Sequence, residues 1–293
     1  MAILLALLSA LAYGLSDFVG GFLSRRTTAW AVAVVAQLSS TICTLAVALF
    51  AGGSPTSQDF MWAVVAGAAS GVGTGFLYRG FSAGRMSVVA PVSAVGAALV
   101  PVLAGTFGGE RLSLLVWCGI GFALPGIWLV SSSTGELPAS GDGPDGSGGA
   151  TTPRRASTAE GLLDGVLAGL GFGSLFAALG QVPDEAGLWP LAATQAVSIP
   201  SVILLAVGLR AAWVPRGRTV WWALLAGPLG ASATGAFLLA THSGFLTVAG
   251  VLASLYPATT VLLAALVLHE KIHRAQGVGL GLCALAIVLV AGG

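Results

Sequence analysis

The stretch WAVVAGAASGVGTGF, residues 62–76, has a second copy in the chain at residues 222–236, WALLAGPLGASATGA. The second copy lies 160 positions after the first, and six residues are identical at this offset. The same offset carries Gly84 onto Gly244 and Glu110 onto Glu270. Nearer the start of each half of the chain the offset is one or two positions shorter, so that Gly14 corresponds to Gly173 and Gln37 to Gln195. The chain is therefore an internal duplication.

The composition indicates that the duplicated unit lies in a membrane. Of the 293 residues, 56% are hydrophobic and 8% are charged. A soluble globular chain carries about 25% charged residues, so most of this surface is expected to face lipid. The formal net charge of +1 also argues against nucleic-acid binding.

The apolar runs predict an all-α polytopic membrane protein, because a bilayer-crossing helix needs about 20 mostly apolar residues. Ten segments meet this requirement: 2–23, 29–51, 60–79, 86–106, 114–131, 161–180, 188–209, 219–240, 245–268 and 275–292. We expect a first repeat over residues 1–131, a flexible linker rich in Gly, Ser and Pro over 132–160, and a second repeat over 161–293.

The number of spans in each repeat predicts their relative orientation. Five spans are an odd number, so the second repeat must enter the membrane upside down relative to the first. Inverted repeats of this kind build many secondary transporters, with the binding site between the halves near the bilayer midplane.

Two stretches resemble the EamA family of the drug/metabolite transporter superfamily: AYGLSDFVGG at 12–21 and LYPATTVLLAALVLHEKIHRAQGVGLGLCALAIVLV at 255–290. The second is similar to the family's pattern of a proline in the penultimate helix, a Glu-basic pair at its end and a Gly-rich final helix. The resemblance implies a multi-pass protein of the inner (cytoplasmic) membrane. It also implies export of amino acids, other small metabolites or drugs, while related families exchange sugar phosphates and nucleotide sugars.

Asp17 is an acid within the first apolar run, where a carboxylate costs about 3 kcal/mol on insertion scales. Its equivalent in the second repeat is Phe176. On one interpretation Asp17 binds a cationic group of the substrate or carries a proton. On the other it is hydrogen-bonded by its helix neighbours, or lies close enough to the interface to reach water or Arg25.

Neutral polar residues recur at equivalent positions and are candidates for a cavity wall. We expect a substrate-binding or coupling site formed by Asp17 together with Tyr13, Gln37, Thr74, Gln195, Thr234 and Tyr256. The alternative for each is a hydrogen bond between helices, worth about 0.6–2 kcal/mol in membranes.

Prolines and the repeated glutamates have separate expected roles. Pro91, Pro101 and Pro257 each remove a backbone donor, so they predict either bends used in gating or static kinks. Glu110 and Glu270 end two spans, and we expect structural roles at the interface, either pairing with nearby bases or capping the following helix.

The sequence predicts a secondary active transporter, an exporter of a small organic solute that works by alternating access. The alternatives are a lipid-linked carrier flippase or a sugar or nucleotide-sugar exchanger; a channel or a membrane enzyme fits less well. No nucleophile–base pair, paired carboxylates or metal-ligand spacing is evident, so we expect no enzymatic activity, no metal and no cofactor. The expected partners are the solute, protons and the bilayer, with the chain a monomer or a homodimer.

The orientation of the termini is open, because two arguments disagree. Odd-numbered connections between spans contain eleven Arg and Lys residues and even-numbered ones contain only Arg111. The positive-inside rule therefore places the odd connections in the cytoplasm and both termini outside. Resemblance to ten-span EamA proteins implies termini in the cytoplasm.

Overall fold

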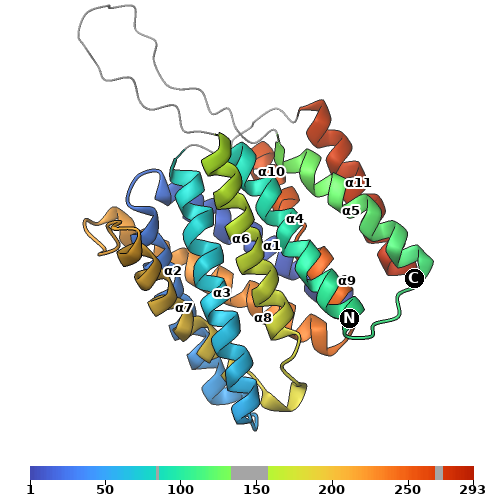
Figure 1. Ribbon diagram of the computed structural model, residues 1–293, viewed down its shortest axis with the longest axis horizontal. Helices are drawn as coiled ribbons and strands as arrows, with labels where there is room; N and C mark the ends of the chain where they lie inside the picture. Colours follow the sequence, from blue (N-terminus) through green and yellow to red (C-terminus); the bar gives the residue numbers. More distant parts are fainter. Residues whose placement is uncertain (84–85, 133–157, 268–272) are drawn as a thin grey trace, which may run out of the picture.

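The computed structural model describes residues 1–83, 86–132, 158–267 and 273–293 (Figure 1). Within these ranges the chain is helical and contains no strand, which confirms the predicted fold class. Eight helical segments are long and apolar enough to cross a membrane, and shorter apolar helices start at Leu114 and Leu246.

The first repeat contains five helices: α1 (Ala2–Ser24), α2 (Ala29–Ala51), α3 (Ser57–Ser82), α4 (Met86–Phe107) and α5 (Leu114–Ser132). The second contains α6 (Thr158–Leu179), η1 (Asp184–Ala186), α7 (Trp189–Gly208), η2 (Thr219–Leu225), α8 (Ala226–His242), α9 (Leu246–Ala253), α10 (Tyr256–Val267) and α11 (Arg274–Gly292). The expected linker falls mostly on residues 133–157, which lie outside the described residues.

The two repeats interlock, and their contacts come in equivalent pairs. α6 packs on α3 and α4, while α1, its equivalent, packs on α8, α9 and α10. α2 packs on α7, and α5 on α11. The C-terminal end of α5 and the N-terminal end of α6 lie at one end of the bundle, and both chain termini lie toward the other (Figure 1). α1 and α6 therefore run in opposite directions, as inversion of the repeats requires.

The predicted span 245–268 is wrong as a single helix, because α9 ends at Ala253 and α10 begins at Tyr256. Pro257 has no backbone N–H and lies in the first turn of α10, where the missing donor carries little cost. Ala258 bonds back to the carbonyl of Leu255 (2.9 Å), a three-residue step that belongs to the turn. The ninth span is therefore two short helices joined at Ser254 and Leu255. In contrast, α4 remains one helix through Pro91 and Pro101.

Glycines bring the two repeats into backbone contact. A Cβ atom on Gly171 of α6 would lie 2.5 Å from the backbone nitrogen of Gly73 on α3. A Cβ on Gly67 would lie 2.5 Å from the carbonyl oxygen of Thr194 on α7. At these positions only glycine allows the helices to approach so closely.

Gly171→Leu is expected to destabilise the protein strongly, because the obstacle is backbone and cannot move aside. Overpacking costs typically about 1–3 kcal/mol, and contact with backbone should place this variant at or above the upper limit. The matched control is Gly281→Leu on α11, since a Cβ there meets nothing within 4 Å. Thermal unfolding in detergent should show a lower Tm for Gly171→Leu alone. Similar Tm values for the two variants would contradict the close packing of α3 against α6.

Candidate functional site

Six of the seven residues predicted to bind substrate lie around one cavity deep in the bundle. They are Tyr13 and Asp17 on α1, Gln37 on α2, Thr74 on α3, Gln195 on α7 and Thr234 on α8. The cavity has a volume of about 40 Å³, and its lining residues come from both repeats. Tyr78 on α3 and Phe172 on α6, which were not among the predicted site residues, also line it.

The glutamines and threonines form two equivalent pairs, one from each repeat. Gln37 Nε2 donates to Thr74 Oγ1 (3.3 Å) and to Ser70 Oγ (3.2 Å). Gln195 Nε2 donates to Thr234 Oγ1 (3.4 Å). The cavity wall thus follows the internal symmetry of the chain, with the same amide–hydroxyl contact on both sides.

Tyr256 lies behind the cavity wall rather than in it. Tyr13 shares a hydrogen bond with Thr234 (3.0 Å between the hydroxyl oxygens), and the rings of Tyr13 and Tyr256 lie 6.5 Å apart. The Tyr256 hydroxyl shares a hydrogen bond with Ser93 of α4 (3.1 Å). The first residue of α10 is thereby tied to α4 on one side and to the cavity wall on the other.

The Asp17 carboxylate is part of the cavity lining. The residue is 9% exposed, and none of the residues that the structure describes gives its carboxylate a hydrogen bond or an ion pair. Its helix neighbour Ser16 donates to the carbonyl of Ala226 instead (3.1 Å). A buried carboxylate without compensation is costly, so a positive charge or a proton in the cavity would stabilise it.

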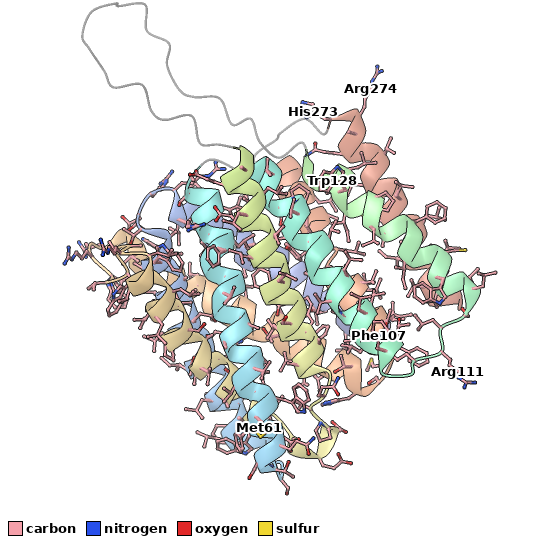
Figure 2. All side chains as sticks on the ribbon, viewed as in Figure 1. Met61, Phe107, Arg111, Trp128, His273 and Arg274 are labelled. Carbon is pink, nitrogen blue, oxygen red and sulfur yellow. The ribbon has the colours of Figure 1, made fainter. Side chains whose placement is uncertain are left out.

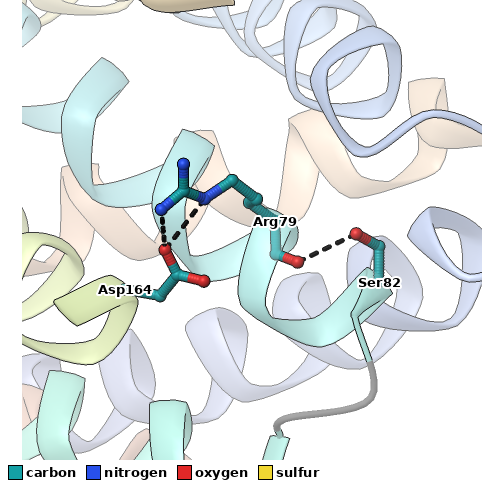
Figure 3. A network of polar contacts seen from close by, with 3 residues as sticks. All are labelled: Arg79, Ser82 and Asp164. Carbon is teal, nitrogen blue, oxygen red and sulfur yellow. Dashed lines mark hydrogen bonds and ion pairs between the residues drawn. The ribbon is translucent and has the colours of Figure 1, made fainter. Parts of the chain in front are cut away.

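A second buried acid, Asp164, was missed in the sequence because it lies only one turn inside its span. The side chain of Asp164 on α6 is fully buried and forms an ion pair with Arg79 on α3 (Figure 3). Arg79 Nε donates to Asp164 Oδ1 (2.8 Å), and the guanidinium lies over the Phe76 ring, 4.6 Å from its centroid. Arg79 directly follows the cavity residue Tyr78. The ion pair therefore joins the two repeats between the cavity and the end of the bundle where α3 ends and α6 begins.

Glu110 caps a helix of the opposite repeat, so the expectation that it pairs with a base or caps the following helix is wrong. Its two carboxylate oxygens accept the backbone N–H groups of Leu246 (2.6 Å) and Thr247 (3.1 Å). These are the first residues of α9, whose free N–H groups and dipole attract a negative charge. The repeat equivalent, Glu270, lies outside the described residues.

Of the two prolines in α4, Pro101 lies on the side of this contact. The side chain of Pro101 packs directly against Gly250 of α9, where a Cβ would lie 2.4 Å from the Cβ of the proline. Pro91 is buried on the same helix. Within the described ranges, no three His, Cys, Asp or Glu side chains lie close enough to hold a metal ion.

A helical bundle of two interlocked inverted repeats, with a polar cavity between them, is the architecture of many membrane transport proteins. The chain belongs to the EamA-like transporter family, whose sequence profile matches residues 1–132 and 159–292. Both repeats are covered, so the predicted family and the multi-pass membrane class are confirmed.

Two similar proteins agree with this architecture. An uncharacterized protein of Methanocaldococcus jannaschii, MJ1333.1, is 28% identical over 133 residues, which are 45% of this chain and 97% of that protein. It is therefore about as long as one repeat. A solved structure titled "Crystal structure of protein" covers 98% of this chain and 95% of its own, with a TM-score of 0.65 and 18% identity. At that identity the likeness shows the fold alone.

Proposed function

We propose that the protein exports a small organic solute across the cytoplasmic membrane by alternating access around the cavity described above. The observation that carries this proposal is the Asp17 carboxylate, which has no partner among the described residues and shares the cavity with two repeat-related Gln–Thr pairs. A site built from equivalent residues of inverted repeats can open to either side of the membrane when the two repeats exchange conformations. The cavity needs no catalytic group for this, and we propose no enzymatic activity.

The flippase and the channel are less well supported by the same cavity. Its polar side chains come from helices of both repeats and surround an interior space, whereas a channel usually shows a ring of like charges or of filter carbonyls. The nucleotide-sugar exchanger needs cationic side chains for its phosphates, and the residues described around this cavity include none.

A flux assay tests the proposal while the substrate is still unidentified. Proteoliposomes are loaded with a mixture of cellular metabolites, and loss of each solute is followed by mass spectrometry against liposomes without protein. Selective, saturable loss of one chemical class supports the proposal. Non-selective leakage of all small solutes would indicate a channel, and no loss in either orientation of the protein would contradict transport.

Pro257→Ala is expected to slow transport. The substitution supplies the missing N–H one turn after Ala253, so α9 and α10 can join into one stiffer helix. If the break lets α10 move with Tyr256, the initial flux should fall severalfold while Tm stays equal or rises. Unchanged flux would make the break a static feature. The control is Pro183→Ala, which removes an exposed proline ahead of η1.

Cysteine labelling is expected to place the Arg-rich end of the bundle in the cytoplasm. The structure puts Arg274 and Arg111 at opposite ends of the bundle (Figure 2). Arg216 and Arg111 are both exposed, in an odd and an even connection respectively. With a membrane-impermeant thiol reagent on intact cells, Arg111→Cys should label and Arg216→Cys should not. The reverse pattern would show that the termini lie in the cytoplasm.

A further inference from the structure

The symmetry of the cavity fails most clearly between α1 and α6. At the offset of 159 residues, Tyr13, Ser16 and Asp17 of α1 correspond to Phe172, Leu175 and Phe176 of α6. Tyr13, Ser16, Asp17, Phe172 and Leu175 line the cavity. The same three helix positions thus supply a polar surface on one repeat and an apolar surface on the other, although the neighbouring Gln–Thr pairs are present in both halves of the chain.

The polar side carries a single kind of charge. Asp17 is the only carboxylate among the described lining residues, and no Arg, Lys or His is among them. Tyr13 and Tyr78 line the same cavity as Asp17, and the Tyr256 ring lies 6.5 Å from the Tyr13 ring, behind the lining. The hydroxyl of Ser40, a lining residue that is 2% exposed, also has no hydrogen-bond partner among the described residues. Two buried polar groups of the cavity lining therefore have no hydrogen-bond partner in the part of the chain that the structure describes.

The apolar side is closely packed and partly aromatic. Phe176 is buried behind the lining, stacked on Phe237 with ring centroids 4.4 Å apart and edge-on to Tyr13 at 5.7 Å. Phe172 and Leu175 face the cavity in front of it. Such a surface favours an apolar or aromatic group and offers no hydrogen bond.

We infer that the transported solute is an amphipathic organic cation, with an ammonium group held by Asp17, Tyr13 and Tyr78 and an apolar body against Phe172 and Leu175. This inference rests on the proposed transport function and narrows its substrate class. An ammonium would give Asp17 a charge-assisted hydrogen bond, and tyrosine faces add cation–π attraction. A carboxylate or phosphate on the solute would meet Asp17 without a compensating cation, which disfavours amino acids and sugar phosphates.

The test uses four probes that share one phenyl group and differ in charge. They are 2-phenylethylammonium, phenylalanine, phenylacetate and the neutral 2-phenylethanol; ethylammonium tests the apolar wall, and tetraphenylphosphonium extends the series to a bulky cation. Each is titrated into the purified full-length protein in detergent, and the shift of Tm and the heat of binding are measured. At least one of the two phenyl-bearing cations should raise Tm in a saturable manner. Phenylalanine, phenylacetate, 2-phenylethanol and ethylammonium should bind at least about tenfold more weakly, a difference of about 1.4 kcal/mol.

Variants assign the effect to the two walls. Asp17→Asn should abolish binding of the cation, and Asp17→Glu should restore part of it. Phe172→Ser should weaken the binding of the phenyl-bearing cation and leave any ethylammonium binding unchanged. The control is Glu185→Gln, which removes an exposed carboxylate from η1 and should leave binding unchanged.

Three results would overturn the inference: equal binding of phenylalanine or phenylacetate, cation binding that survives in Asp17→Asn, or no binding of either phenyl-bearing cation. Its failure is distinct from failure of the proposed function. Flux of another solute class in the metabolite assay, without cation binding, would refute only the substrate class. Cation binding without any flux would refute transport and leave the binding site standing.

Discussion

Asp17→Asn is expected to reduce flux by about 10- to 150-fold for whichever solute the wild-type protein moves. This range follows from the loss of a hydrogen bond to a charged group, worth about 1.5–3 kcal/mol. Asparagine keeps the size of the side chain, and the described structure gives the carboxylate no partner to lose. Without bound solute, the Tm of the variant should therefore be equal to that of the wild type or higher.

The pH profile separates the two roles open to Asp17. If the carboxylate carries a proton or competes for one, wild-type flux should change with pH, and the Asn variant should lose that dependence. Initial rates in proteoliposomes from about pH 5 to pH 9, with Glu185→Gln as control, make the comparison. Equal rates and identical profiles for wild type and Asp17→Asn would remove Asp17 from the mechanism.

Cross-linking α3 to α6 at the ion pair is expected to stop transport completely. Arg79 and Asp164 connect the repeats on one side of the cavity, so the cavity can open toward that end only if the pair separates. Arg79→Cys and Asp164→Cys are combined in a chain without Cys43, Cys118 and Cys283. A short bifunctional methanethiosulfonate reagent should abolish flux, and a reductant should restore it.

Two controls are needed because the double variant also loses the ion pair. The single-cysteine variants treated with the same reagent should keep the flux that they had before treatment. Separately, Asp164→Asn should lower Tm, since removing one member of a buried pair costs up to about 3–5 kcal/mol, and the partial exposure of Arg79 reduces this. Undiminished flux in the cross-linked protein would show that transport does not require α3 and α6 to part at this end.

Much of the fold and of the cavity wall follows from the duplication in the sequence. Gln37 and Gln195, like Thr74 and Thr234, stand at equivalent positions, and an inverted repeat brings equivalent positions of its two halves toward one axis. Polar residues on apolar helices then have few places to lie other than between the halves. The cavity could be predicted for this reason, whereas the presence of Phe172 in its wall could not, because an apolar residue on an apolar helix gives no signal.

The features missed in the sequence depend on partners far away in the chain. Glu110 caps α9, 136 positions further on, and only the packing of α4 on α9 brings the two together. In the sequence, Asp164 resembles an ordinary acid at the membrane interface. Only the packing of α6 on α3 brings Arg79 beside it. The break in the ninth span is local, yet a proline in an apolar run is also compatible with an unbroken helix, as α4 shows at Pro91 and Pro101.

The central claim is that one cavity between the repeats opens alternately to the two sides of the membrane, and accessibility of Ser40→Cys tests it most directly. Ser40 lines the cavity and its hydroxyl bonds to nothing described, so the substitution is mild. The background lacks the three native cysteines, and Ser9→Cys, at a fully buried position outside the cavity lining, is the unlabelled control.

A membrane-impermeant thiol reagent is applied to right-side-out and to inside-out vesicles. Alternating access predicts labelling of Ser40→Cys from both sides, abolished by cross-linking residues 79 and 164 on one side only. Labelling confined to a single side, whether or not the cross-link is present, would contradict the account.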